Sequence, residues 1–347
     1  LTPTWATWAI GGAFAWVAGL LVLAAFNLVE VPLQALIRRL FPPKTTYDEG
    51  PDLSRRRVLL ATGAVAGALT TGSFLHGMLH TRYAWRVRRV PVRIPGLPAG
   101  WRGARILQFS DFHAGTWDDK AAVAEGLQLI LDEAPDLIVY TGDLVNDRTD
   151  EVLPFTDLLG QIAAPLGVYA ILGNHDYGDY TNWPTPQDKQ ANFALLLRLY
   201  EQMGWRLLRN EHVRLTRGGD ELALIGSENW GSPPFPQRGD LDAATRSLPP
   251  ELPAILLSHD PTHWRGEILG HPRTFPLTLS GHTHGMQLGV EEEHLKFSPI
   301  QYKYPEWAGL YPDAATGQQL YVNRGFGCLG FPGRVGIPPE VTVLELS

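Results

Sequence analysis

An apolar run that stops at an aspartate constrains this chain more than any other stretch: Leu137–Tyr140 is followed by Thr141, Gly142 and Asp143. Four apolar or aromatic residues in a row predict a buried strand. The run places Asp143 at the carboxyl end of that strand. In open α/β sheets, ligands bind at the carboxyl ends of the strands. Asp143 is therefore a candidate for the chemistry of this chain.

Four further apolar runs end in the same way, on Asp, Asn or His. They span residues 106–110, 168–172, 254–258 and 275–280, and they lead to Asp111 and His113, to Asn174 and His175, to His259, and to His282 and His284. Helical patterns lie between the runs, at residues 118–133, 150–162 and 191–203. Alternating strands and helices, with antiparallel pieces late in the chain, predict an α/β fold with two sheets. The polar strand ends predict a site assembled from loop tips.

The residue types at these strand ends are those of a metal site. Carboxylates, neutral imidazoles and one amide suit Mn, Fe, Zn or Co. The single Cys328 excludes an internal disulfide framework and a thiolate-rich zinc site. Two such ions form a clamp for in-line displacement at phosphorus, with one carboxylate bridging them and a hydroxide between them as nucleophile. Seven ligands leave positions open for hydroxide and substrate, and His175 remains to protonate or stabilise the leaving group.

Five short motifs resemble those of the calcineurin-like metallophosphoesterases, in the family's order: residues 111–113, 142–143, 173–176, 258–261 and 281–284. The resemblance covers residues 104–347. It implies a four-layer α/β sandwich, with two mixed sheets flanked by helices. It also implies two divalent metal ions, with Mn favoured over Zn, Fe or Co. One ion would be held by Asp111, His113, Asp143 and His284, and the other by Asp143, Asn174, His259 and His282.

One position departs from the family pattern. The family usually has a second Asp three residues after the first, paired with the catalytic His, and this chain has Asn146 there, followed by Asp147. An amide cannot stabilise an imidazolium as a carboxylate does. Either Asp147 or Asp176 substitutes, or His175 is a weaker acid–base group.

A substrate contact is expected from the Gly-rich stretch near the C-terminus. Arg324, with Asn323 beside it, could hold a phosphate there. The alternative is that Arg324 forms a structural salt bridge.

The N-terminal part predicts a membrane anchor. Residues 5–29 contain no charged residue, which predicts a transmembrane helix within residues 1–34. Residues 35–57 form a basic loop in which Ser54 and Arg55–Arg57 are similar to a twin-arginine export signal. Residues 58–80 predict a second transmembrane helix or an uncleaved signal anchor. Residues 81–103 are rich in Pro and Arg and predict an extended connector, with its arginines either on lipid headgroups or in solvent, before a catalytic domain at residues 104–347.

The charge distribution supports this arrangement. Residues 1–103 contain 12 Lys and Arg against 4 Asp and Glu, whereas the remainder contains 17 against 32. An acidic body argues against a nucleic-acid partner. The basic N-terminal part fits anionic lipid headgroups. We expect a protein of the cytoplasmic membrane whose basic loop faces the cytoplasm and whose catalytic domain lies outside.

These observations favour a membrane-anchored phosphoesterase that hydrolyses a phosphodiester or phosphomonoester of a small molecule or a lipid. One alternative is a lipid-pathway pyrophosphatase of the UDP-diacylglucosamine type, which the membrane-anchored branch of the family resembles. Its substrate is cytoplasmic, in conflict with the expected topology. The other alternative is a metal-binding scaffold without catalysis, although such a chain would be expected to have lost ligands.

Overall fold

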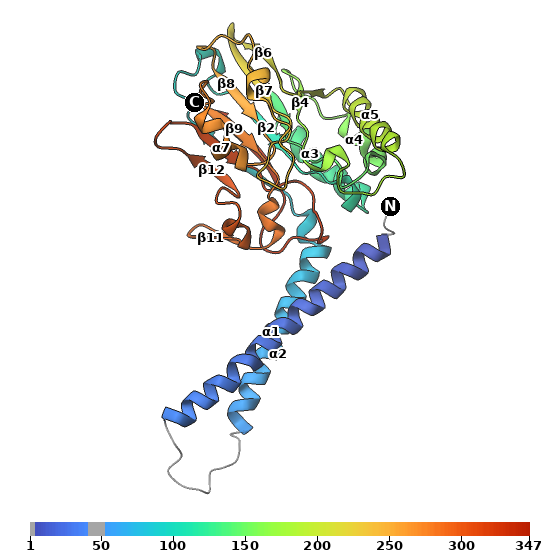
Figure 1. Ribbon diagram of the computed structural model, residues 1–347, viewed down its shortest axis with the longest axis vertical. Coiled ribbons are helices and arrows are strands. Elements are labelled where there is room, and N and C mark those ends of the chain that lie inside the picture. Colours follow the sequence, from blue (N-terminus) through green and yellow to red (C-terminus); the bar gives the residue numbers. More distant parts are fainter. Residues whose placement is uncertain (1–3, 41–52) are drawn as a thin grey trace.

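The structure, a computed structural model, describes residues 4–40 and 53–347 of the chain. It begins with two long helices, α1 (Thr4–Leu40) and α2 (Leu53–Leu79). Within them, Trp5–Phe26 and Arg57–Tyr83 are long and apolar enough to cross a membrane. The two helices extend away from the rest of the chain (Figure 1), and only 17% and 11% of the most apolar windows in these spans are buried. They are therefore not core helices of the α/β domain.

Small residues allow the two helices to cross closely. A Cβ atom added to Gly19 would lie 2.6 Å from the Gly67 carbonyl oxygen, and one added to Gly67 would lie 2.7 Å from the Gly19 carbonyl oxygen. The Thr71 hydroxyl donates a hydrogen bond to the Ala15 carbonyl at 3.3 Å. Small residues and hydroxyl bonds of this kind are typical of helix pairs in membranes.

Both helices extend into the predicted loop at residues 35–57. Residues 41–52 of that loop lie outside the described residues, as do the side chains of Arg55 and Arg56. The twin-arginine interpretation therefore stays a prediction.

The first sheet has six strands in the order β1–β14–β2–β3–β4–β5. Their bounds are β1 Arg86–Val92, β2 Arg105–Phe109, β3 Leu137–Tyr140, β4 Val168–Ala170, β5 Arg206–Leu207 and β14 Glu340–Leu346. Strands β2 to β5 are parallel, β14 pairs antiparallel with β2, and β1 pairs parallel with β14. All four residues of β3 are buried, as a continuous apolar run predicts.

The second sheet also has six strands, in the order β12–β13–β9–β8–β7–β6. Their bounds are β6 Glu211–Arg217, β7 Asp220–Gly226, β8 Ala254–Leu257, β9 Leu277–Ser280, β12 Gly309–Pro312 and β13 Gln319–Val322. Strands β7, β8, β9 and β13 are parallel, and the outer strands β6 and β12 are antiparallel to their neighbours. A separate two-stranded hairpin is formed by β10 (Val290–Glu292) and β11 (Leu295–Phe297).

Helices cover the outer face of each sheet. α3 (Lys120–Asp132), α4 (Thr156–Leu159) and α5 (Pro186–Gln202) pack on the first sheet, and α6 (Leu241–Ala244) and α7 (Thr262–Gly266) on the second. A third apolar cluster, which includes Val139 and Leu257, lies between the sheets. The order is helices, sheet, sheet, helices, so the predicted class of two mixed sheets flanked by helices is confirmed.

Strand β1 corrects the prediction of an extended connector at residues 81–103. It pairs with β14 from Arg86 opposite Glu340 to Val92 opposite Leu346, so the first sheet begins before residue 104. Two of its three arginines form ion pairs within the domain: Arg88 lies 2.7 Å from Glu291, and Arg89 pairs with Glu133. Carboxylates of the domain thus balance these two charges, and the Arg89 side chain remains 58% exposed.

A buried ion network fixes β14 to its neighbours. The Glu340 side chain is fully buried and pairs with Arg324, and its second partner, Arg88, lies 3.4 Å away. The Tyr321 hydroxyl donates to it at 2.5 Å. Burial alone would raise the pKa of Glu340, but the two guanidinium groups outweigh it and lower the pKa. The carboxylate therefore stays ionised in the core.

We predict that Glu340→Ala destabilises the domain by about 3–5 kcal/mol, because it leaves Arg324 buried without one of its carboxylates. Thermal unfolding of the detergent-solubilised full chain, followed by tryptophan fluorescence, measures the change. Lys120→Ala is the control, since Lys120 pairs with the exposed Asp157, and it should leave the midpoint unchanged. Equal midpoints for both variants would contradict a stabilising role for the network.

Candidate metal centre

The strand ends of both sheets meet at one place and bring the predicted side chains together. In the first sheet, β2 leads to Asp111 and His113, β3 to Asp143, and β4 to Asn174 and His175. In the second sheet, β8 leads to His259, and β9 to His282 and His284. Backbone hydrogen bonds join these loops, for example from the Asp111 N–H to the Gly142 carbonyl at 2.9 Å. The site therefore depends on the packing of the two sheets.

Most of these side chains sit on strained backbone. Of the ten non-glycine residues with positive φ in the described part of the chain, five are predicted ligands, with φ of 55° at Asp111, 48° at His113, 60° at Asp143, 75° at His282 and 51° at His284. Such conformations are costly for residues with a side chain and cluster at functional sites. A left-handed residue thus follows β2, β3 and β9 within a few residues of each strand's end.

Two glycines are required by the closeness of these loops. A Cβ atom at Gly173 would lie 2.1 Å from an Asp143 carboxylate oxygen, and one at Gly281 would lie 2.3 Å from an Asp111 carboxylate oxygen. Each glycine directly precedes a predicted ligand. Any larger residue would push a neighbouring carboxylate away.

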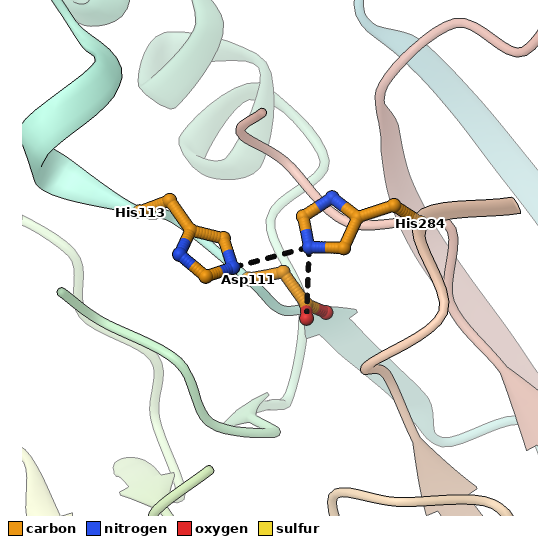
Figure 2. Close-up of side chains that lie close together, drawn as sticks. All are labelled: Asp111, His113 and His284. Atoms are coloured by element: carbon orange, nitrogen blue, oxygen red, sulfur yellow. Dashed lines mark hydrogen bonds and ion pairs between the residues drawn. The ribbon is translucent and has the colours of Figure 1, made fainter. Parts of the chain in front are cut away.

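The first group of donors comprises Asp111, His113 and His284. Figure 2 shows the two imidazoles and the carboxylate converging, with His113 Nε2 and His284 Nε2 3.1 Å apart and His284 Nε2 3.3 Å from Asp111 Oδ1. Two nitrogens bound to one ion at about 2.1 Å, at tetrahedral or octahedral angles, lie roughly 3.0–3.4 Å apart. The observed spacing fits a shared cation.

The second group comprises Asp143, His259 and His282. Asn174 joins it, because its Oδ1 lies 2.9 Å from His282 Nδ1. His259 Nε2 lies 3.3 Å from the same nitrogen. This group supplies two imidazoles, one carboxylate and one amide oxygen, which is a donor set suited to a borderline divalent metal.

Asp143 lies between the two groups. Its Oδ2 is 3.1 Å from His259 Nε2 in the second group and 3.7 Å from His113 Nε2 in the first. Its other oxygen accepts the His175 main-chain N–H at 2.9 Å. One oxygen of Asp143 is thus within reach of both groups, as a bridging ligand must be.

Hydrogen bonds at the ring nitrogens that point away from the site determine which nitrogen of each imidazole faces a metal ion. His259 Nδ1 lies 2.7 Å from the Thr141 carbonyl, which can only accept, so Nδ1 carries a proton and Nε2 is the nitrogen directed at the site. His282 faces the site with Nδ1, while its Nε2 lies 2.9 Å from the Tyr304 hydroxyl and 3.4 Å from Asp260. Such outer partners commonly orient metal-ligating histidines. The residues present therefore fit a pair of divalent cations.

The electrostatics of the site favour positive charge. Burial would raise the pKa of Asp111, but the neighbouring His284 and His259 hold it at about 2. Burial would lower the pKa of His259, but Asp143 and Asp111 raise it to about 10. Burial dominates at His113, whose pKa is lowered well below its usual value. The ionised Asp111 and the neutral His113 are ready to bind a cation, whereas His259 must give up its Nε2 proton when a cation binds.

The structure corrects the expected partner of His175. His175 Nδ1 lies 2.5 Å from the main-chain carbonyl of Asn146, whereas the Asn146 side chain accepts the Gly115 N–H at 3.1 Å. The Asp147 main-chain N–H donates to Glu151 at 3.1 Å, and no hydrogen bond between Asp147 and His175 is found in the described structure. A main-chain carbonyl orients His175, and neither Asp147 nor Asp176, the two expected substitutes, is hydrogen-bonded to His175 in the described structure.

Asp176 has a different role from the one that the sequence suggested. The buried Asp176 carboxylate accepts the main-chain N–H groups of Asp143 at 2.9 Å, Leu144 at 2.8 Å and Gly173 at 2.9 Å, which holds two ligand loops together. Burial and the nearby Asp143 raise its pKa to about 7. The sequence suggested Asp176 as a possible partner of His175, but the structure has it bonded to the main chain of the ligand loops.

Arg324 and Asn323 do not lie ready for a substrate. The Arg324 guanidinium pairs with Glu291 and Glu340, and only 2% of the residue is exposed. Asn323 is fully buried and donates to Thr342 at 3.0 Å. Of the two alternatives for Arg324, the structure supports the salt bridge.

Comparison with known proteins agrees with this geometry. The sequence profile of the family described as calcineurin-like phosphoesterase matches residues 104–286, which is more than half of the chain. The chain belongs to this family. The two groups of donors correspond to the two divalent metal ions on which the family depends.

Three relatives are informative. A transmembrane protein with a metallophosphoesterase domain from Bos taurus is 30% identical over 307 residues, which cover 85% of this chain and 64% of that protein. The phosphodiesterase YaeI of Escherichia coli is 28% identical over 299 residues, covering 85% of this chain and 99% of YaeI. The UDP-2,3-diacylglucosamine pyrophosphatase LpxG of Chlamydia muridarum is 26% identical over 310 residues, covering 75% and 88%. The match thus spans less than two thirds of the bovine relative.

We predict that Asp143→Asn empties both metal positions, because one oxygen of Asp143 approaches both groups. The metal content of the purified chain, measured by elemental analysis, should fall from about two divalent ions per molecule to nearly none. The circular dichroism spectrum should stay unchanged. His212→Asn, a histidine bonded to the Ala244 carbonyl on the second sheet, is the control and should keep its metal. Retention of one full equivalent in Asp143→Asn would contradict the bridging role.

Proposed function

We propose that this chain is a membrane-anchored phosphoesterase that hydrolyses a phosphodiester or a phosphomonoester with two divalent metal ions. The observation that carries the proposal is the position of Asp143 Oδ2, 3.1 Å from His259 Nε2 and 3.7 Å from His113 Nε2. A carboxylate oxygen shared by two buried groups of donors is the arrangement that a two-metal phosphoryl site requires. Membership of the phosphoesterase family supports the same conclusion.

The residues divide the coordination as their contacts suggest. Asp111, His113 and His284 would hold one ion, and Asn174, His259 and His282 the other, with Asp143 shared. Mn is the favoured metal, with Zn, Fe and Co as alternatives, because the donors mix imidazole nitrogen with carboxylate and amide oxygen. When bound, the two cations would polarise the phosphoryl group and supply an acidified water as nucleophile.

His175 would deliver the proton to the leaving group. Because its Nδ1 donates to the Asn146 carbonyl, its Nε2 is the nitrogen left to exchange a proton with a substrate. The ring packs against His113 with centroids 5.0 Å apart and against Tyr180 with centroids 4.5 Å apart. These contacts fix the ring beside the first group of donors, within reach of a bound phosphoester.

We predict that His175→Gln lowers kcat by about 10²–10⁴-fold while the metal content stays unchanged, since a general acid contributes about this much. The loss should be large for an alkyl leaving group and small for p-nitrophenol, which leaves without a proton. Hydrolysis of both esters by Mn-loaded protein measures the difference. Equal losses for the two leaving groups would contradict proton donation, and loss of metal would indicate a structural role instead.

Membrane anchorage is the second part of the proposal. Residues 1–34 and 58–80 would cross the membrane, with residues 35–57 on one side and the catalytic domain of residues 104–347 on the other. The amino end of α1 and the carboxyl end of α2 both meet the domain (Figure 1), where Trp8 Nε1 donates to Asp118 at 2.6 Å. We assign the basic loop, with Arg55–Arg57, to the cytoplasm and the catalytic domain to the outside of the cytoplasmic membrane.

We predict that alkaline phosphatase fused after Ser347 is active in a bacterial host and that a green fluorescent protein fused at the same position is dark, because both report export of the C-terminus. Fusion of each reporter after residue 45, in the loop between the helices, is the matched control and should give the opposite result. The reverse pattern would place the catalytic domain in the cytoplasm.

A lipid-pathway pyrophosphatase is the rival enzyme. The relative LpxG carries the name of UDP-2,3-diacylglucosamine pyrophosphatase, and the apolar helices would keep this chain close to lipid substrates. A cytoplasmic domain together with turnover of a diacylated nucleotide sugar would favour this rival. A scaffold without catalysis is disfavoured, because all seven predicted ligands are present and close together. A hydrolysis screen over diesters, monoesters, nucleotide sugars and lipid phosphates separates the three.

A further inference from the structure

One loop of the domain is docked on both long helices. In this helix-docking loop, residues 329–335, the ring of Phe331 lies 5.6 Å from Phe14 of α1 and 5.2 Å from Phe74 of α2, measured between centroids. The Arg334 main-chain N–H donates to the Gly77 carbonyl of α2 at 3.2 Å. The domain therefore has a defined orientation relative to the helices.

The residues that directly precede the β10–β11 hairpin, Gln287 and Gly289, are bonded to this helix-docking loop. The Gly289 N–H donates to the Val335 carbonyl at 2.9 Å, and the Val335 N–H donates to the Gln287 carbonyl at 2.6 Å. The Gln287 side chain donates to the Phe331 and Gly333 carbonyls at 2.8 and 2.9 Å. In Figure 1, β11 lies at the end of the domain from which α1 and α2 project. The hairpin thus belongs to the part of the domain nearest to the helices.

The two faces of the hairpin differ in chemistry. The face turned to the domain carries Glu291, which pairs with Arg88 and Arg324, and Lys296, which donates to the Tyr311 hydroxyl at 3.2 Å. Since side chains alternate along a strand, the other face carries Val290, Leu295 and Phe297, with Glu292 opposite Leu295 at the turn end of the hairpin. These three are 42%, 55% and 40% exposed. Exposure of such a face to water does not stabilise an isolated two-stranded hairpin, and an exposed apolar patch indicates a contact surface.

We propose that Val290, Leu295 and Phe297 rest in the lipid interface of the membrane that α1 and α2 enter. The proposal depends on the proposed anchorage and goes beyond it, because it assigns a lipid contact to the catalytic domain. We choose the bilayer rather than a protein as the partner of this face, because the residues just before the hairpin are hydrogen-bonded to the helix-docking loop, which packs on α1 and α2. Tyr302, which is 82% exposed and follows the hairpin in the chain, is a residue type enriched at this depth.

The turn of the hairpin defines the kind of lipid contact. Glu293 and His294 form the turn, and Glu292 is the last residue of β10 before it, so anionic headgroups would not attract this end of the hairpin. Insertion would come from apolar burial, as for interfacial segments in general. The contact should therefore persist on zwitterionic lipid and at high salt. It would also hold His284, which precedes the hairpin by a few residues, close to the headgroups, where an amphiphilic phosphoester presents its phosphate.

The test uses single cysteines in the full-length chain, because the native Cys328 is buried. Leu295→Cys and Val290→Cys are labelled with bimane and reconstituted in dioleoylphosphatidylcholine vesicles, with and without a brominated phosphatidylcholine. We expect a several-fold loss of fluorescence in brominated vesicles and weak quenching by iodide. Thr216→Cys is the control: it is exposed on β6, at the end of the domain opposite to the helices in Figure 1, and should show the reverse.

Two failures are distinguishable. If the labelled chain floats with the vesicles but the label at residue 295 behaves like the label at residue 216, the lipid contact of the hairpin is overturned and the anchorage stands. If the chain does not float with the vesicles, the proposed anchorage itself fails, and the inference fails with it.

Discussion

Left-handed backbone at the ends of strands is the constraint on which the site depends. Asp111, Asp143 and His282 each follow an apolar strand and turn with positive φ, which costs energy that the rest of the fold has to offset. The offset comes from the bonds that join the loops, above all those from three main-chain N–H groups to the buried Asp176. Because these loops come from both sheets, the donors meet only when the sheets are packed. Binding of metal and folding of the domain are therefore coupled.

A second set of buried charges joins β1, β14 and the segments near them. Glu340 on β14 pairs with Arg88 on β1 and with Arg324 after β13, and Arg324 in turn pairs with Glu291 on the β10–β11 hairpin. Four segments that are distant in the sequence are thus joined by charges that no single segment could bury alone. Because these ion pairs occupy its guanidinium group, Arg324 is not available to bind a substrate. A basic residue near a phosphoesterase site can be structural when carboxylates surround it.

The sequence predicted those parts of the molecule that depend on local chemistry. The buried parallel strands are continuous apolar runs, and the seven proposed ligands come shortly after them. The two sheets and the meeting of the ligands at the strand ends could therefore be predicted. Strand β1 could not be predicted in this way, because three of its seven residues are Arg. Two of these arginines are accommodated in the sheet by ion pairs with Glu133 and Glu291. The partner of His175 was missed for a different reason. A main-chain carbonyl leaves no signal in the residue type.

The helices and the site are connected through one stretch of chain. From His282 and His284 the chain continues into the β10–β11 hairpin, and the residues just before the hairpin are bonded to the helix-docking loop on α1 and α2. The crossing of those helices is fixed in turn by the contact of Gly19 with Gly67. A change in the helix crossing would therefore be transmitted through residues 329–335 to the loop that carries two of the proposed ligands. A fragment that lacked α1 and α2 would therefore leave Phe331 and its neighbours without the surface on which they pack.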